Sequence, residues 1–328
     1  MKRIYLFLLS LLIVGKMVSC QTSQEGKNTE TPRIFYVNSY HPGYGSSDDV
    51  MAGIESVLSD KNVQWKTTFM DTKNHPGEAA IQTKVDEILQ QIEEYQPHLI
   101  IASDDNAIKY LIEPYFKNQE IPVVFCGVNW SADQYGLPAS NVTGMLEVLP
   151  IQEMLIEMKN YYPEANQLMV LSENTNSEKK NKTLLDTLYQ RMGFSTEYAL
   201  VDNFEEWKSA FLRGNEKYDL IFIPTNGAIK NWNETAAIEF VKQSIKVPVL
   251  ASDDFMMKYA VFGLTKIAAE QGEWAAKTAL DILEKAKNPD QIPLAKNQQT
   301  KAWINQELAE VIGFKPDPEL SADLNIVN

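Results

Sequence analysis

The chain has 328 residues, a net charge of −14 at pH 7, three histidines and two cysteines. Its acidity argues against nucleic acid as a partner, because nucleic-acid phosphates would be repelled. The histidines show no metal-ligand spacing, and Cys126 has no partner if Cys20 carries another group. We therefore expect no metal, no cofactor and no disulfide framework.

The N-terminus has the pattern of an export signal. A basic start precedes an apolar run at residues 4–15, which is too short to be a permanent membrane span. A small residue, Ser19, directly precedes Cys20, and this arrangement resembles a bacterial lipobox, in which the cysteine is lipidated after cleavage. Plain secretion is the alternative. We expect a signal peptide at residues 1–19 and a flexible polar tether at residues 20–32.

Apolar segments and amphipathic segments follow one another along the rest of the chain. This alternation predicts a series of strands and helices. In chain order it predicts strand 34–37, helix 50–58, strand 63–70, helix 78–95, strand from 99, a helical segment, strands 121–128 and 141–147, helix 150–162, strand 168–171, helix 177–192, strand 195–201, helix 204–212, strand from 220, a helical segment, strands 247–254 and 259–265, and helices 270–286 and 298–311.

One stretch of the sequence occurs in two similar copies. Residues 99–109 read LIIASDDNAIK, and residues 220–230 read LIFIPTNGAIK. Each copy predicts a strand, a polar turn and a helix, and each is followed by a second apolar run at residues 121–128 and 247–254. Such units form parallel sheets covered by helices, so two copies predict an α/β fold with two Rossmann-like lobes.

The strand and helix that remain after both copies indicate that the chain crosses back between the lobes. Three hinge crossings are expected, near Met145, Tyr259 and Pro293. The sequence therefore predicts two lobes, each built from two separate segments of the chain. Lobe 1 comprises residues 33–145 and 262–290, lobe 2 comprises residues 146–261 and 291–314, and residues 315–328 form a C-terminal tail.

Polar and aromatic residues gather at the ends of the predicted strands. In open parallel sheets ligands bind beyond the carboxyl ends of the strands. Acids, hydroxyls and amides there suit a small zwitterion such as an amino acid. Helix capping is the alternative role for the serines, acids and amides, and packing within a lobe is the alternative role for the aromatic residues. The candidate ligand-binding residues are Ser39, Tyr40, Tyr44, Ser103, Asp104, Asn129, Glu173, Asn174, Thr225, Asn226, Asp253 and Asp254.

Several segments, in order, resemble the substrate-binding proteins of ABC importers, in particular the two-lobed tryptophan-binder-like members. The resemblance covers residues 33–314. It rests on SYHPGY (39–44), IPVVF (121–125), NVTG (141–144), PIQE (150–153), ENTNS (173–177) and IPTN (223–226).

The resemblance implies the type I periplasmic-binding-protein architecture and a function in solute capture. It implies a lipid-anchored monomer in the bacterial cell envelope, facing the periplasm or exterior, with a small-molecule ligand and an ABC permease as partners. Similar SYHPGY turns occur in extracytoplasmic sensing domains, so a ligand sensor for a receptor kinase is the alternative. The chain has no GxSxG, P-loop or GxGxxG motif, and we expect no enzyme activity.

The resemblance also assigns roles to some candidates. Glu173, Thr225 and Asn226 match the binding turns of the family. Asn129 stands where the family often has aspartate, so Asp104 or Asp253 would supply the contact to a ligand ammonium.

Overall fold

The computed structural model describes residues 30–317 and 324–327. The described residues from Pro32 onward form one compact unit. The predicted signal peptide, Cys20 and most of the predicted tether lie outside the described residues. In the part that is described, no helix has the length and hydrophobicity needed to cross a membrane.

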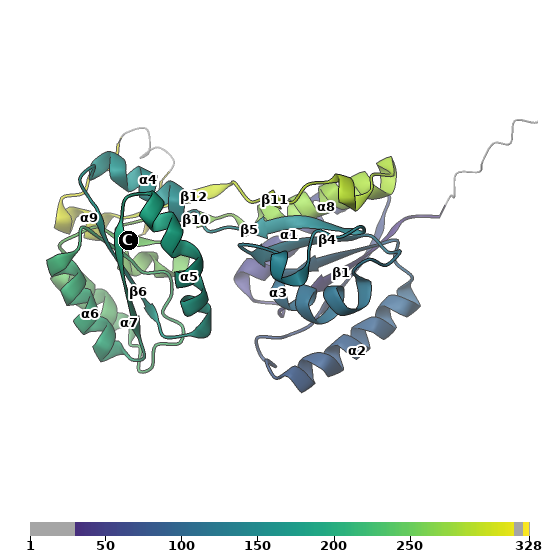
Figure 1. The fold of residues 1–328 in the computed structure, drawn as a ribbon, viewed down its shortest axis with the longest axis horizontal. Coiled ribbons are helices and arrows are strands. Elements are labelled where there is room, and N and C mark those ends of the chain that lie inside the picture. The colour runs from purple at the N-terminus through teal and green to yellow at the C-terminus, as the bar shows by residue number, and fades with distance from the viewer. Residues whose placement is uncertain (1–29, 318–323, 328) are drawn as a thin grey trace, which may run out of the picture. The chain divides into compact units, whose positions relative to one another are not determined.

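Two β-sheets organise this unit (Figure 1). The first contains six strands among the described residues, in the order β11-β5-β4-β3-β1-β2, and every pairing is parallel. Its strands are β1 (Arg33–Asn38), β2 (Gln64–Phe69), β3 (Leu99–Ser103), β4 (Val123–Asn129), β5 (Val142–Glu147) and β11 (Ala295–Lys296).

The second sheet contains seven described strands in the order β13-β12-β10-β9-β8-β6-β7. Its pairings are parallel except that of β10 with β12. The predicted α/β class with parallel sheets is therefore confirmed. The strands are β6 (Gln167–Glu173), β7 (Ser195–Val201), β8 (Leu220–Phe222), β9 (Val249–Ala251), β10 (Phe262–Lys266), β12 (Thr300–Asn305) and β13 (Asn325–Val327).

Helices cover both faces of the first sheet, and we call this assembly the first lobe. Alternate residues of a strand point to opposite faces, so Phe35 and Val37 pack into one core while Ile34 and Tyr36 pack into another. The first core includes α2 and η1, and the second includes α1 and α8, which lie side by side (Figure 1). These elements are α1 (Gly45–Leu58), α2 (Glu78–Tyr95), α3 (Asp104–Ala107), the π-helix η1 (Ile108–Phe116), the 3₁₀ turns η2 (Asp133–Tyr135) and η4 (Pro289–Gln291), and α8 (Ala268–Lys285).

The second sheet and its helices share one apolar core, and we call this assembly the second lobe. The side chain of Trp207 is fully buried there and lies against the rings of Phe211 and Trp232. Such aromatic packing buries a large apolar area. The helices are α4 (Ile151–Tyr161), α5 (Asn176–Arg191), α6 (Phe204–Lys217), α7 (Glu234–Ser244), the 3₁₀ helix η3 (Asp254–Tyr259) and α9 (Gln306–Ile312).

The chain passes between the two sheets at three places in the described part. These passages follow β5, β10 and β11. Two predicted lobe boundaries are wrong. β10 is predicted in lobe 1, as part of residues 262–290, but pairs with β9 in the second sheet. β11 is predicted in lobe 2, as part of residues 291–314, but pairs with β5 in the first sheet. Tyr259 lies buried within the second lobe rather than at a passage. A hinge role for these passages stays a prediction.

The duplicated unit is only partly duplicated in structure. In the first copy Ala107 ends helix α3 and the chain continues into η1, whereas residues 226–230 form a turn and α7 begins later, at Glu234. Pro224 and Gly227 distinguish the second copy, and both residue types disfavour a helix. The expected second helix at the Ala-Ile-Lys motif is therefore wrong.

The predicted helix at residues 298–311 is also wrong over its first half. Residues Thr300–Asn305 form β12, which runs antiparallel to β10, and the helix α9 begins only at Gln306. The Asn305 side chain accepts a hydrogen bond from the Leu308 N–H and so caps the new helix. The indole Nε1 of Trp303 donates to Thr265 on the neighbouring strand, a contact that local periodicity does not encode.

Candidate ligand-binding site

The carboxyl ends of the first sheet carry polar residues that long-range contacts organise. Asn38, Ser103, Asn129 and Glu147 are the last residues of β1, β3, β4 and β5. In the second sheet Lys266 ends β10, which runs parallel to β9. Ligands bind at such strand ends in α/β proteins, so a ligand site is expected here.

A buried ion pair joins the two lobes at these ends. The Lys266 ammonium donates to a Glu147 carboxylate oxygen, and both side chains are largely buried. The Gln271 amide, at the beginning of α8, donates to the other Glu147 oxygen over 2.9 Å. The Gln271 Oε1 atom is buried and has no hydrogen-bond partner among the described residues. The hydrogen bond to Glu147 therefore holds the Gln271 side chain, with that oxygen atom, beside the strand ends.

Asp104 lies in the field of this pair. Its backbone has φ +69°, a left-handed conformation that non-glycine residues seldom adopt. A Cβ atom added to Gly127 would lie 3.3 Å from an Asp104 carboxylate oxygen, so the glycine leaves room for the side chain. Burial and the negative charge of Glu147 raise the pKa of Asp104 to about 8, against an opposing effect of Lys266. Such perturbed carboxyls are typical of functional sites.

Asp253, which follows β9, has similar surroundings in the second lobe. Burial raises its pKa to about 6, and Lys266 opposes the shift while Glu147 adds to it. Asp253 occupies the N-cap position of η3, yet its side chain makes no capping hydrogen bond. The side chain of Ser103, the N-cap of α3, makes none either. Side-chain capping therefore does not account for Asp253.

Tyr40 and Tyr44 form an aromatic pair in the first lobe. Their ring centroids are 4.8 Å apart, and both side chains are half-buried. The Lys73 ammonium lies 4.8 Å from the Tyr40 centroid and 5.1 Å from the Tyr44 centroid. Both rings therefore present their faces to a cation.

Ser39 and Ser103 serve the interior of the first lobe. The Ser39 hydroxyl donates to the Ser103 carbonyl and accepts from the Ala107 N–H. The Ser103 hydroxyl is 3.0 Å from the Tyr36 hydroxyl, and both serine side chains are fully buried. These bonds hold the start of α3 at the end of β1.

Asn129 is held by a neighbouring acid. Its side-chain amide donates to Asp105 over 2.7 Å, and the Tyr135 hydroxyl donates to the other Asp105 oxygen. Asp105 thus fixes the loop after β4. The ligand role of Asn129 stays a prediction, and it would require this bond to be shared or broken.

The remaining candidates lie on the second lobe. The Glu173 carboxylate accepts from the Ala228 N–H over 2.6 Å and fastens the loop that carries Thr225 and Asn226. Those two residues are half-buried. Asn174 is exposed and donates to Asp202, and Asp254 is exposed at the start of η3. Their roles in binding also stay predictions.

Sequence reasoning missed Glu147, Lys266 and Gln271. Glu147 closes a predicted strand, so its position was available, but its partners stand 119 and 124 residues further on. Lys73 was missed as well, because its contact with the tyrosines depends on how two loops meet. In the described part of the chain no three His, Cys, Asp or Glu side chains are grouped as a metal site.

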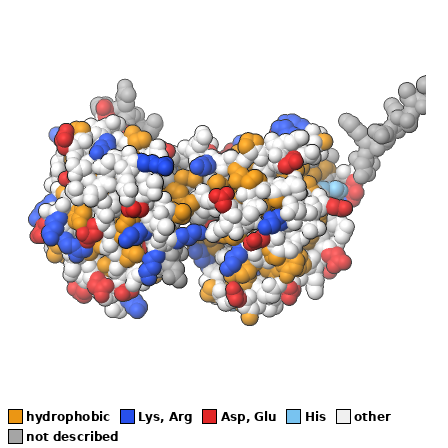
Figure 2. Space-filling view, viewed as in Figure 1, with side chains coloured by type: hydrophobic (Ala, Val, Ile, Leu, Met, Phe, Trp, Pro, Cys, Tyr) orange, Lys and Arg blue, Asp and Glu red, His pale blue; other side chains and the backbone are white. Residues whose placement is uncertain are grey.

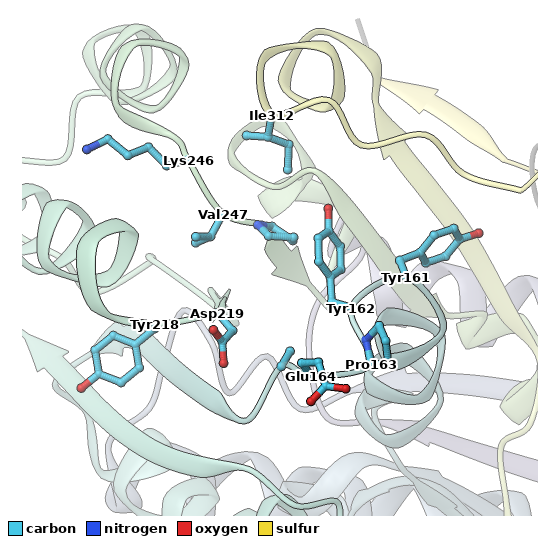
Figure 3. A pocket seen from close by; sticks show the side chains of 11 residues that line it. Tyr161, Tyr162, Pro163, Glu164, Tyr218, Asp219, Lys246, Val247 and Ile312 are labelled. Atoms are coloured by element: carbon cyan, nitrogen blue, oxygen red, sulfur yellow. The ribbon is translucent and has the colours of Figure 1, made fainter.

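A cavity of about 490 Å³ lies elsewhere, at the amino ends of the second sheet (Figure 3). Tyr162, Val247 and Ile312 surround it, and Asp219 lies on its wall (Figure 3). The Asp219 carboxylate already accepts from the Asn166 and Gln167 N–H groups. The cavity therefore lies at the end of the sheet opposite to the carboxyl ends of the strands, where ligands bind in such folds.

Acidic and basic side chains are interspersed over the described part of the face that Figure 2 displays. No broad region of one sign stands out on that face.

Known structures share this fold. The ligand-free, open structure of CD0873, a substrate-binding protein with adhesive properties from Clostridium difficile, matches with a TM-score of 0.73 and 15% identity over 90% of this chain and 99% of that chain. A Streptococcus pneumonia ABC domain in complex with L-Trp matches with a TM-score of 0.62 and 19% identity over 91% of this chain and all of that chain. The leucine-binding protein LivK from Thermotoga maritima matches with a TM-score of 0.54 and 13% identity over 86% of this chain and 87% of that chain.

A search of curated proteins finds no match. The family model for ABC transporter substrate binding proteins matches residues 41–323, a range that includes every described strand except β1 and β13. The chain therefore belongs to the ABC transporter substrate-binding proteins, a family of binding proteins rather than enzymes.

Proposed function

We propose that this protein captures a small solute with an amino group, an amino acid or a similar zwitterion, for an ABC importer. The observation that carries the proposal is a pair of carboxyls, Asp104 and Asp253, at strand ends of different lobes. Each has a raised pKa and lies in the field of the Glu147–Lys266 pair. A ligand ammonium would stabilise the ionised form of both carboxyls.

Two structural relatives support the amino-acid class. One was solved in complex with L-Trp and another is a leucine-binding protein. Both are under 25% identical to this chain, so they support the type of ligand through the shared fold and do not identify it.

The proposal includes anchoring through a lipid on Cys20 and delivery to a membrane permease. Members of the family act outside the cytoplasmic membrane with such a partner. Cell fractionation of the wild type and of Cys20→Ala tests the anchor: the wild type should sediment with membranes and the variant should not. Sedimentation of both would leave lipidation of Cys20 without support.

A thermal-shift screen over amino acids, amines, nucleosides and sugars tests the site. A ligand present at 100 times its dissociation constant adds about 2.7 kcal/mol to the free energy of unfolding. Asp104→Ala and Asp253→Ala should each abolish the shift caused by the best amine-bearing ligand. Asp49→Ala, at an exposed position of α1, is the control and should retain it.

The alternative function, a ligand sensor for a receptor kinase, differs in one measurable respect. Deletion of the gene should abolish uptake of the labelled ligand by the cells if the protein serves an importer. Normal uptake in the deletion strain would favour the sensor.

A further inference from the structure

A lysine of this chain lies over the faces of two tyrosines at the candidate site. The Lys73 ammonium lies 4.8 and 5.1 Å from the ring centroids of Tyr40 and Tyr44. Ammonium groups within about 6 Å of a ring centroid are attracted by the negative face of the ring. Lys73 is exposed and lies in the loop after β2, so its side chain can leave the rings without breaking the core.

The loop that carries Tyr40 lies beside the one that carries Asp104, because Ser39 donates a hydrogen bond to the carbonyl of Ser103 over 2.6 Å. The pKa of Tyr40 is raised by burial first and then by the charges of Asp104, Tyr44 and Glu147. The hydroxyl of Tyr40 therefore lies within electrostatic reach of both carboxylates. Aromatic faces and carboxylates next to one another are the two groups that attract an organic cation in proteins.

Asp104 and Asp253 have no ion-pair partner of their own in the described part of the chain. Glu147 is paired with Lys266. Within the described residues, no lysine or arginine lies at ion-pair distance from Asp104 or Asp253. A zwitterion would bring no net charge to these acids, whereas an organic cation would bring at least one net positive charge.

We propose that the site selects an organic cation, a solute with more amino groups than carboxylates, whose ammonium binds between Tyr40, Tyr44 and Asp104. In the absence of ligand the Lys73 ammonium takes this position and competes with the solute. The inference rests on the proposed function and narrows its ligand class.

Matched ligands test the charge preference by calorimetry on the mature chain. L-Lysine and L-norleucine differ in a terminal ammonium, and tryptamine and L-tryptophan differ in a carboxylate. The cationic member of at least one pair should bind about tenfold more tightly than its partner, since hydrogen bonds to charged groups are stronger than those between neutral groups.

The outcomes separate the two proposals. If L-norleucine and L-tryptophan both bind as tightly as their cationic partners, the cation preference is overturned and an amino-acid site remains in place. Absence of binding by L-lysine, tryptamine and 1,5-diaminopentane also overturns the preference. Absence of binding by these compounds and by the zwitterions contradicts the proposed function as well.

Lys73→Met tests the competing lysine. Removal of an exposed cation–π contact should strengthen binding of the preferred cation about two- to fivefold, because the ligand no longer has to displace the lysine. Lys66→Met is the matched control: Lys66 is also exposed and lies 5.8 and 6.0 Å from two ring centroids, those of Phe35 and Tyr95.

Unchanged or weaker binding by Lys73→Met would overturn the role of Lys73 as a stand-in for the ligand. An equal gain in Lys66→Met would show a general effect of net charge and would overturn it as well. Tyr40→Leu should weaken cation binding while Tyr115→Leu, an exposed tyrosine of η1, should not.

Discussion

Lys266, the last residue of β10 in the second sheet, donates a hydrogen bond to Glu147, the last residue of β5 in the first sheet. Each residue immediately precedes a passage of the chain between the sheets. Besides burial, which raises the pKa of both Asp104 and Asp253, Glu147 raises both values and Lys266 lowers both, so the pair acts on the two carboxyls together. The pair links the fold to the candidate site.

Lys266→Met should destabilise the protein by about 3 kcal/mol, because Glu147 would stay buried without its ion-pair partner. Urea denaturation measures the loss. Lys277→Met breaks an exposed pair with Glu273 and should change the free energy of unfolding by less than about 0.5 kcal/mol. Equal stability of the two variants would contradict a structural role for the buried pair.

Local sequence patterns predicted much of the fold. The period of apolar residues placed α2 at residues 78–95, its observed bounds, since one face of that helix carries Ile81, Val85, Ile88 and Ile92 into the core. The pattern of apolar residues predicted a helix at Thr300–Asn305, where pairing with β10 instead produces a strand. A short segment with mixed propensity follows its tertiary partner.

The site was predicted less completely than the fold. Strand ends supplied Asp104, Asp253, Tyr40 and Tyr44, because topology alone places such residues together. Hydrogen-bond partners could not be predicted in this way. Ser39 and Ser103 turned inward to other side chains and backbone groups, and the Glu147–Lys266 pair joins residues 119 positions apart.

Asp104→Asn should become more stable than the wild type as the pH rises. The pKa of Asp104 is about 8 in the folded protein against 3.8 for an ordinary aspartate. The folded state therefore holds an extra proton between these values, and the stability that Asp104 contributes is present below pH 4 and is lost as the pH rises through 8. Asparagine cannot titrate, so the difference in melting temperature should grow from pH 4 to pH 8 and level off above it.

Melting curves of both proteins at pH 4, 6, 8 and 9 measure this difference. Asp49→Asn, at an exposed position, supplies the control and should track the wild type. A difference between Asp104→Asn and wild type that does not vary with pH would contradict the raised pKa.

Binding of an amine-bearing ligand should release a proton near neutral pH. Asp104 is largely protonated at pH 7 in the free protein, and a nearby ammonium favours its ionised form. Calorimetry in phosphate and in Tris buffer at the same pH detects the proton through the different ionisation heats of the buffers. Identical heats in both buffers, or release that persists in Asp104→Asn, would exclude Asp104 as the source.

Gly272→Ala should destabilise the first lobe, although alanine usually favours a helix by about 1 kcal/mol. A Cβ atom at Gly272 on α8 would lie 1.9 Å from the Val50 carbonyl oxygen on α1, so the two helices would have to separate. Such overpacking costs about 1–3 kcal/mol. Gly45→Ala, with open space around its Cβ, should be nearly neutral in the same urea denaturation.

The same substitution should also weaken ligand binding. Gln271, the neighbour of Gly272, donates to Glu147, and a shift of α8 would move this amide away from the carboxylate. The loss of affinity should therefore accompany the loss of stability in Gly272→Ala and be absent in Gly45→Ala. Full affinity in a destabilised Gly272→Ala would show that the position of α8 does not control the site.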